Sequence, residues 1–305
     1  SFEEVVASIQ SRFGRGAAVV QIPGGSGSRS IIDVLVMKQL TWPVGSKQPT
    51  VSDIPEEFAD RAEELHNELV ESIAENDEAL MNLYFEQGTL SEDEMRSGLR
   101  LAMAHRDLFP IFIASATENI GVTRLMDFVK NVCPPPTLSE PQPTDSGEVK
   151  YDSNGTPIAL VFKTMAEHHV GEYSFLKVCS GKLTPGIDLE NAANKGTERL
   201  NQLFSINGHE RENMPSMAAG DIGAVVKLRN THTGNTLHPK GSDIVVSPIK
   251  FPDPRYRMAV RPTRQGEEDR LAQGLHQLHE EDPSLIITHD SHLNQILLSG
   301  QGDTH

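Results

Sequence analysis

The stretch from Phe251-Pro252-Asp253-Pro254 to Gly300-Gln301-Gly302-Asp303-Thr304-His305 decides the fold of the C-terminal part of the chain. Polar and apolar residues alternate after its first prolines, as they do in a strand with one buried face. Leu271, Leu275 and Leu278 then recur at helical spacing, and two short apolar runs follow. The expected elements are, in order, a strand, a helix and two strands, at Arg255 to Pro262, Glu267 to Glu281, Leu285 to Ile287 and Gln295 to Leu298.

This order of elements is most of a ferredoxin-like unit, in which a strand, a helix and a strand are followed by a strand, a helix and a strand. The second helix and the last strand of such a unit would follow His305. Gly300 and Gly302 stand where that helix would be capped. We therefore predict a partial ferredoxin-like domain in a chain that is an internal fragment of a longer protein.

A proline-rich segment from Cys133 to Pro143 divides the rest of the chain, because its prolines disfavour helix and favour an extended spacer. Before this segment, apolar runs alternate with helical stripes, as in an α/β domain. After it, β-type runs alternate with turn residues and predict a small barrel, an architecture that leaves no exposed strand edge. The expected strands are Ala17 to Ile22, Ile31 to Met37 and Ile111 to Ala114, followed by Ile158 to Lys163, Tyr173 to Cys179, Arg199 to Ile206 and Ile222 to Leu228.

The predicted fold class is therefore multidomain α+β. We expect an α/β part at residues 1–133 and a proline-rich linker with its lead-in at 134–156. A β-barrel at 157–249 and the partial ferredoxin-like domain at 250–305 complete the expected organisation.

The α/β part contains an acidic helical insertion at residues 53–94, which holds 15 Asp or Glu residues and a single basic residue, Arg61. Apolar residues recur through it at helical spacing, and Ser91-Glu92-Asp93-Glu94 has the pattern of a capping box for a further helix. Such a charge run is typical of a solvated helix face, and it is also suited to docking a basic or helical partner. The sequence leaves both interpretations open.

Composition restricts the partners of the chain. The net charge of −16, from 27 basic and 43 acidic residues, argues against a general nucleic-acid coat and leaves local patches for any RNA contact. Cys133 and Cys179 lie far apart without metal-ligand spacing, which is typical of free thiols in a reducing compartment. No apolar run approaches the ~20 residues of a membrane helix, and Ser1-Phe2-Glu3-Glu4 lacks signal-peptide features. We expect a cytoplasmic, monomeric chain with no membrane partner.

The sequence lacks a phosphate loop, because Gly-x-x-x-x-Gly-Lys-Ser/Thr occurs nowhere in it. The nearest imitation is Gly24-Gly25-Ser26-Gly27-Ser28-Arg29, whose amides and Arg29 side chain could attract an anion. The β-type run that follows it favours a plain loop between strands. The histidine pairs His276/His279 and His289/His292 lack a completing set of ligands, so we predict no metal site and no catalytic residue in this chain.

Ser115 and Ala116 are the candidate nucleotide-binding residues. They open the turn Ser115-Ala116-Thr117-Glu118-Asn119-Ile120-Gly121, which follows a predicted buried strand and precedes a predicted helix. In an open α/β sheet, this is the edge at which ligands bind. A tight strand-to-helix turn without a ligand is the alternative.

Arg255, Arg257 and Arg261 share one face of their predicted strand, with Arg264 just beyond it. We expect Tyr256, Met258 and Val260, on the opposite face, to pack inward. Four guanidinium groups on an outer face suit contact with RNA phosphates, and a solvated strand face is the alternative.

Several blocks together resemble elongation factor G, the ribosomal translocase. Phe251-Pro252-Asp253-Pro254 and Glu280-Glu281-Asp282-Pro283-Ser284 are similar to its third domain, and Phe175-Leu176-Lys177-Val178-Cys179-Ser180-Gly181 is similar to its barrel. Residues 1–38 with the acidic helices resemble the insertion in its GTPase domain, and 111–133 resemble the end of that domain. Asp303 and Thr304 stand where the family has Glu and Leu, so the resemblance is to a divergent member.

The resemblance implies that residues 1–133 are the C-terminal part of a P-loop GTPase domain and that Ser115 and Ala116 lie beside guanine. The family often has lysines where Glu118 and Ile120 stand here. The intact parent would use GTP and Mg²⁺ to promote ribosomal translocation, whereas this chain would bind neither and would not hydrolyse GTP. Its implied partners are ribosomal RNA and, at the acidic helices, the ribosomal stalk protein.

Two other functions remain open at this point. One is a non-catalytic ribosome-binding module. The other is a related GTPase, such as a tetracycline ribosome-protection protein or the GTPase release factor, which shares the barrel and the third domain.

Overall fold

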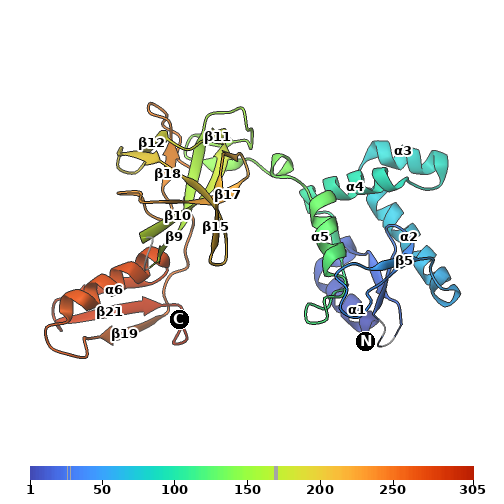
Figure 1. Cartoon of the computed structure of the whole chain (residues 1–305), viewed down its shortest axis with the longest axis horizontal. Helices are drawn as coiled ribbons and strands as arrows, with labels where there is room; N and C mark the ends of the chain where they lie inside the picture. The colour runs from blue at the N-terminus through green and yellow to red at the C-terminus, as the bar shows by residue number, and fades with distance from the viewer. Residues whose placement is uncertain (26, 28, 168–170) are drawn as a thin grey trace. The chain divides into compact units, whose positions relative to one another are not determined.

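The computed structural model describes residues 1–25, 27, 29–167 and 171–305, and it divides into two compact units, Ser1–Ser139 and Glu140–His305 (Figure 1). The division falls within the proline-rich segment, directly after a short 3-10 turn at Pro136–Leu138. Each unit has its own cluster of buried apolar side chains.

The first unit contains two small sheets. In the first sheet, strand β1 (Ala17–Val19) pairs in parallel with β6 (Phe109–Ile111), although almost ninety residues separate them. The second sheet is antiparallel and follows chain order. Its strands are β2 (Gln21–Pro23), β3 (Ser30–Asp33), β4 (Lys38–Thr41) and β5 (Thr50–Ser52).

Helices supply most of the core of the first unit. They are α1 (Phe2–Phe13), α2 (Glu56–Ala74), α3 (Glu78–Gln87), α4 (Glu92–His105) and α5 (Val122–Asn131). Leu69 and Ile73 of α2 and Leu99 of α4 are fully buried, with Val20, in one cluster. The capping box at Ser91 is present, because its hydroxyl accepts the Glu94 N–H while the Glu94 side chain accepts the Ser91 N–H. The prediction that this acidic segment is helical is therefore confirmed, and its last helix continues to His105.

Three predicted strands of this unit differ from the observed ones. The strand predicted at Ala17 to Ile22 is divided between β1 and β2, which lie in different sheets, and the other two end earlier than predicted. Strand β3 stops at Asp33, because the Asp33 carboxylate accepts the N–H groups of Leu35 and Val36 and bends the backbone into a turn. Strand β6 stops at Ile111, and the N–H of Ile113 donates to the side chain of Gln21 instead of to a strand.

The glycine-rich stretch that follows Pro23 connects β2 to β3, as predicted, over the residues that the structure describes there; Ser26 and Ser28 lie outside them. Gly24 donates its N–H to the carbonyl of Ser30 at 2.9 Å, which closes the base of this hairpin.

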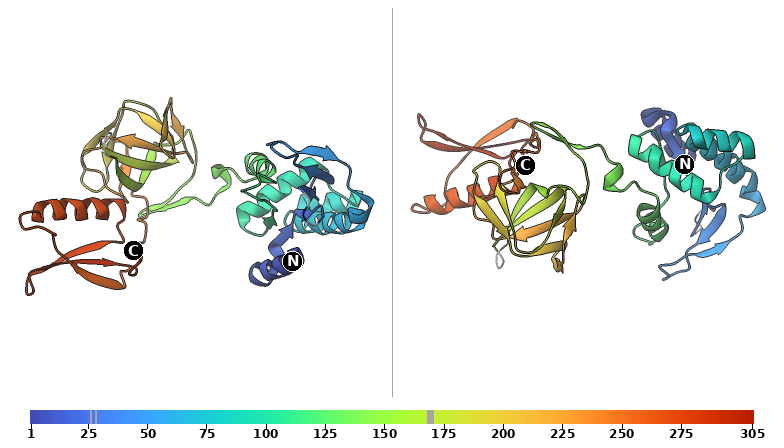
Figure 2. Two further views of the ribbon diagram at one scale, coloured as in Figure 1. Left: turned by 60° about the horizontal axis from the view of Figure 1, so that its bottom comes forward. Right: turned by 90° about the horizontal axis from the view of Figure 1, so that it is seen from above.

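The second unit begins with a barrel-like sheet (Figure 2). Its eight strands are hydrogen-bonded in the order β13-β12-β18-β9-β10-β17-β14-β15, with small accessory pairs β7-β8 and β11-β16. Their bounds are β7 Gln142–Thr144, β8 Gly147–Val149, β9 Ile158–Glu167, β10 Gly171–Ser180, β11 Lys182–Leu183, β12 Ile187–Asn191, β13 Thr197–Leu200, β14 Leu203–Asn207, β15 Glu210–Met214, β16 Met217–Ala218, β17 Ile222–Val226 and β18 Thr236–His238.

The prediction of one continuous strand from Arg199 to Ile206 is wrong. Leu200 ends β13 and Leu203 begins β14, and both side chains are buried in the barrel core. Residues three apart point to opposite faces of one strand, so the chain must break between these two leucines to bury both. The two strands consequently lie in different parts of the sheet.

The end of the second unit is a three-stranded antiparallel sheet with a helix against one face (Figure 2). The elements are β19 (Tyr256–Val260), α6 (Glu268–Glu281), β20 (Ile286–Asp290) and β21 (Gln295–Gly300), with β21 in the middle. The predicted order of strand, helix, strand and strand is confirmed. A partial ferredoxin-like unit requires this arrangement, in which the third strand along the chain lies between the first two and runs antiparallel to both.

Candidate functional site

The loop that carries Ser115 and Ala116 is closed by its own backbone. The N–H of Ser115 donates to the carbonyl of Ile120 at 2.9 Å, and the N–H of Ile120 donates back at 3.0 Å. The N–H of Asn119 adds a 3.3 Å bond to the carbonyl of Ala116. Ala116 is exposed and Ser115 is half-buried. The loop therefore presents both candidate residues after strand β6 in a shape that is fixed without a ligand.

Two residues in left-handed conformations make this shape possible. Asn119 has a φ of 54° and Gly121 a φ of 75°. A Cβ atom at Gly121 would lie 2.3 Å from the carbonyl oxygen of Ile113, so this position has no room for a side chain. Helix α5 starts at the next residue, which fixes the loop between a strand and a helix.

Arg29 contacts the tip of this loop from the antiparallel sheet. Its Nη1 donates to Glu118 Oε2 at 2.7 Å and its Nη2 to the Glu118 carbonyl at 3.0 Å. Its Nε donates to the carbonyl of Trp42 at 2.9 Å. Sequence reasoning placed Arg29 only as a possible anion ligand and Glu118 only as a departure from the family. Their opposite charges were the available signal, but 89 residues separate them, so only the fold identifies the pair.

A buried polar network lies beneath the same loop. Asp33, which is 1% exposed, accepts a bond from Arg124 Nε at 2.7 Å and from Gln21 Nε2 at 3.1 Å. The Oε1 of Gln21 in turn accepts the N–H of Ile113 at 3.1 Å. A buried ion pair must be fully hydrogen-bonded to be tolerated, and Asp33 meets this condition through the two turn amides it also accepts. The network links the antiparallel sheet to the strand and helix on either side of the loop.

Arg255, Arg257, Arg261 and Arg264 are all exposed, on or beside β19. The expectation that the opposite face of this strand is buried is wrong for Tyr256 and Met258, which are 42% and 53% exposed. The physical reason is that α6 packs over β20 and leaves the β19 side of the sheet uncovered. The arginines therefore lie along a strand that is accessible on both faces.

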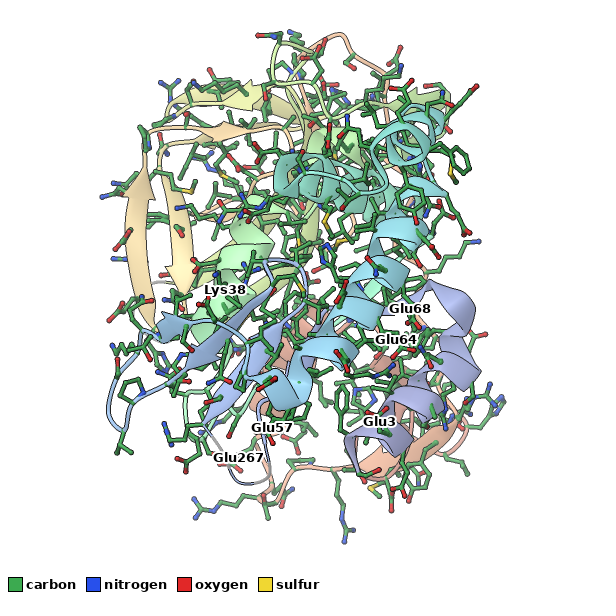
Figure 3. All side chains as sticks on the ribbon, turned by 90° about the vertical axis from the view of Figure 1, so that its right-hand side faces the viewer. Glu3, Lys38, Glu57, Glu64, Glu68 and Glu267 are labelled. Atoms are coloured by element: carbon green, nitrogen blue, oxygen red, sulfur yellow. The ribbon has the colours of Figure 1, made fainter. Side chains whose placement is uncertain are left out.

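The acidic side chains of the insertion gather along α2, with Glu3 of α1 nearby (Figure 3). Arg61 donates to Glu64 at 2.6 Å, and this bond raises the pKa of the guanidinium above its usual value, with smaller contributions from Glu3 and Glu68. A groove of about 910 Å³ opens beside α2. Its charged lining residues are all acidic, namely Glu68, Glu71, Glu75 and Asp107.

The barrel and α6 meet at a polar junction. His232 Nδ1 lies 2.7 Å from Glu280 Oε2, and Glu281 Oε1 accepts the N–H of Ala166 at 3.0 Å. A cavity of about 410 Å³ beside these contacts is lined in part by Glu172 and His276. Partial desolvation of its carboxyl group, reinforced by the charge of Glu280, raises the pKa of the exposed Glu172, although His232 and His276 partly oppose this.

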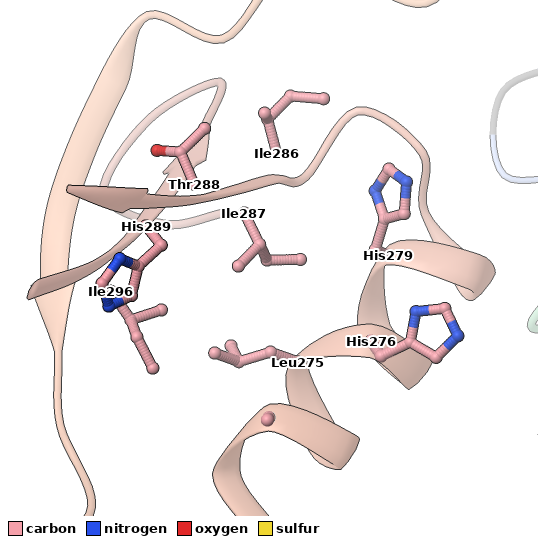
Figure 4. Close-up of a pocket in the computed structure, with 9 residues that line it drawn as sticks. Leu275, His276, His279, Ile286, Ile287, Thr288, His289 and Ile296 are labelled. Atoms are coloured by element: carbon pink, nitrogen blue, oxygen red, sulfur yellow. The ribbon is translucent and has the colours of Figure 1, made fainter. Parts of the chain in front are cut away.

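A second cavity of about 510 Å³ lies between α6 and the sheet (Figure 4). Leu275 and Ile287 point toward each other across it, and His276, His279 and His289 lie at its margin. His279 Nδ1 is engaged by the carbonyl of Leu285 at 2.7 Å. The described residues contain no group of three or more His, Cys, Asp or Glu side chains that could hold a metal ion.

Among the helices that the structure describes, none is both long enough and apolar enough to cross a membrane. The thiols of Cys133 and Cys179 are free, the first half-buried and the second fully buried.

Comparison with known proteins identifies both domains of the second unit. Residues 157–240 match the model for elongation factor G domain 2, and residues 251–305 match the model for elongation factor G domain III. A crystal structure of a Thermus thermophilus protein is similar over 99% of this chain, with 25% sequence identity and a TM-score of 0.83. The chain spans 44% of the length of that protein. Residues 157–240 and 251–305 are therefore similar to domains II and III of elongation factor G.

Proposed function

We propose that this chain is a segment of an elongation factor G-like GTPase that promotes ribosomal translocation in the cytoplasm. In this proposal, residues 1–133 are the C-terminal part of the GTPase domain, and Ser115 and Ala116 contact the guanine base. The observation that carries the proposal is that one chain matches domain II and then domain III, because both domains belong to the same factor. The self-closed loop at the end of a parallel strand supports the nucleotide assignment.

The residues of this chain fit only one part of a nucleotide. The loop at Ser115 and Ala116 suits a base, whereas the sequence contains no phosphate loop and the described residues contain no magnesium ligand set. Phosphate and Mg²⁺ binding therefore have no support from this chain, and no hydrolytic step is assigned to its residues. We expect the isolated chain to show no GTP turnover above background, so a magnesium-dependent burst of phosphate from it would contradict the assignment.

The decisive experiment uses the full-length protein that contains this chain. Ribosome-stimulated phosphate release and movement of messenger RNA by one codon would support a translocase. Tetracycline resistance of translation without codon movement would indicate a ribosome-protection protein, and stimulated ribosome release after termination would indicate a release factor. Absence of nucleotide binding in the full-length protein would leave a non-catalytic ribosome-binding module.

The acidic groove favours a second function for the insertion, which is docking of the ribosomal stalk protein or another basic partner. Glu68, Glu71 and Glu75 line one hollow surface, and such a concentration of one charge steers oppositely charged partners. Reversing Glu63, Glu64, Glu68 and Glu71 to lysine should weaken capture of the stalk protein. The matched control reverses Glu210 and Glu212, two exposed acids on β15. Unchanged capture by the first variant would refute docking at this groove.

We also propose that the arginines on and beside β19 contact ribosomal RNA. The exposure of these side chains supports RNA contact, because a guanidinium group must be accessible at the surface to reach a phosphate. Replacing Arg255, Arg257, Arg261 and Arg264 with glutamine should weaken ribosome binding and flatten its salt dependence, since each lost phosphate contact reduces the number of counterions released. Equal salt slopes for the variant and the parent would contradict the assignment.

A further inference from the structure

We propose that Arg29 is a positioning residue for the loop that carries Ser115 and Ala116, so that the hairpin between β2 and β3 sets the affinity of that loop for a guanine nucleotide. This inference rests on the proposed nucleotide-binding function of the loop. A positioning role differs from that of an anion ligand, the role that the sequence suggested for Arg29.

Each of the three nitrogens of the Arg29 guanidinium donates a hydrogen bond. One edge donates to both the side chain and the backbone carbonyl of Glu118, at 2.7 Å and 3.0 Å, and the Nε donates to the carbonyl of Trp42 at 2.9 Å. The side chain of Arg29 is 26% exposed, whereas that of Glu118 is 62% exposed. Arg29 is therefore the fixed partner of the pair, held against the sheet, and Glu118 is the side chain that it holds.

Trp42 makes the platform beneath Arg29 rigid. Its side chain is fully buried in a cluster with Ile31 and Leu40, and Ile120 of the loop and Ile113 just before the loop pack against this cluster. The backbone N–H of Trp42 donates to the carbonyl of Arg29 at 3.0 Å, and the Nε of Arg29 donates to the carbonyl of Trp42. Hydrogen bonds therefore run in both directions between the two residues. Apolar packing thus joins the sheet to the base of the loop, and the Arg29 guanidinium joins the sheet to the tip of the loop.

The rest of the loop shows why the tip needs this support. The paired amides of Ser115 and Ile120 close the base, and Asn119 bonds to Ala116. Glu118 lies between the residues that make these bonds, and Arg29 bonds to both its carboxylate and its backbone carbonyl. Because the carbonyl oxygen of Glu118 is also held, loss of Arg29 releases the backbone two residues after Ala116 as well as a surface charge.

A lysine cannot reproduce this arrangement. A planar guanidinium presents its donors in fixed directions, whereas an ammonium group acts as a point charge that cannot bridge two carbonyl groups and a carboxylate at once. Arg29→Lys therefore keeps the charge and loses the bridge. A merely electrostatic role for Arg29 would survive this change, and a positioning role would not.

The first experiment measures the dissociation constant of the full-length protein for a fluorescent GDP analogue. Arg29→Glu and Arg29→Lys should each weaken binding by about three- to tenfold, which is the loss expected when one partly exposed, charge-assisted hydrogen-bonded pair is broken. The double variant Arg29→Glu with Glu118→Arg should recover part of the loss. Lys38→Glu is the matched control, because Lys38 pairs with Asp53 at the same 2.7 Å distance in the same sheet but away from the loop.

The second experiment measures hydrogen exchange of the Ser115, Asn119 and Ile120 amides in the chain itself. Faster exchange in Arg29→Glu, with no change in Lys38→Glu, would support the positioning role. Unchanged exchange would overturn it, as would equal GDP affinity in the parent and both Arg29 variants. If the parent full-length protein binds no guanine nucleotide, the proposed function fails, and the exchange result still decides whether Arg29 positions the loop.

Discussion

The buried carboxylate of Asp33 should be the polar group on which the stability of the first unit depends most. Asp33→Ala would remove the acceptor of four bonds, from Arg124 Nε, Gln21 Nε2 and the N–H groups of Leu35 and Val36. Arg124 would keep its charge in a site where only 15% of its side chain is exposed. Its Nη2 already lacks a hydrogen-bond partner among the described residues, so the variant would leave a buried cation almost without acceptors.

Removing one member of a buried ion pair costs roughly 3–5 kcal/mol. Because Arg124 retains some contact with solvent, we expect the lower end, about 3 kcal/mol. For a unit of this size, such a loss lowers the melting temperature by roughly 10 °C. Asp33→Asn should cost less, since the amide oxygen can still accept the turn amides of Leu35 and Val36. The double variant Asp33→Leu with Arg124→Met should recover part of the loss, because no buried charge remains in it.

Trp42 provides the assay. It is the single tryptophan of the chain and is fully buried in the first unit, so its fluorescence during denaturant unfolding reports on that unit alone. Asp53→Ala is the control, because Asp53 also pairs with a basic residue but its side chain is 93% exposed. A midpoint for Asp33→Ala equal to that of the control would refute the reasoning. So would a double variant that is less stable than Asp33→Ala.

Three further predictions test other parts of the molecule. Gly121→Ala should destabilise the first unit by about 1–3 kcal/mol, measured by the same fluorescence, because the new Cβ would collide with the Ile113 carbonyl at a positive φ. Burial raises the pKa of the Cys179 thiol to about 11, so Cys179 should resist a thiol reagent at pH 8 until denaturant unfolds the barrel; fast reaction of the native chain would contradict its burial. Because the pKa of Glu172 is raised, the folded state holds the proton of this carboxyl more tightly than the unfolded state does. The cost in folding stability of ionising Glu172 is therefore absent at low pH and appears as pH rises through the folded pKa. Glu172→Gln should therefore raise the unfolding midpoint of the second unit at pH 7 and leave it nearly unchanged at pH 4, and a larger gain at pH 4 would contradict the sign.

The sequence predicts the fold best where local patterns agree with packing. The leucine spacing of α6 and the serine cap of α4 are local features, and each places its element within a residue or two. The order of elements at the C-terminal end follows from such features alone. The same is true of the loop between β2 and β3, because glycine-rich turns depend on their own residues.

Prediction fails where a distant residue decides the backbone. The run from Ile31 to Met37 reads as one strand, but the Asp33 carboxylate bends it by accepting the N–H groups of Leu35 and Val36. The same carboxylate is buried and paired with Arg124, 91 residues away, which no local pattern reveals. The break between Leu200 and Leu203 likewise depends on closure of the barrel around both side chains. Exposure of Met258 depends on which part of the sheet α6 covers, and no pattern within β19 records that.

The candidate site shows the same division and explains the importance of β3. Ser115 and Ala116 are found from sequence because a small-residue turn after a strand is a local signal. The residues that hold them in place come from the two ends of β3, where Arg29 precedes the strand and Asp33 ends it. Arg29 reaches Glu118 at the tip of the loop, and Asp33 acts through Gln21 on Ile113 at its base. One short strand of the first unit therefore contacts the loop at its tip and at its base, so a partner that shifts this strand should also shift the residues proposed to contact guanine.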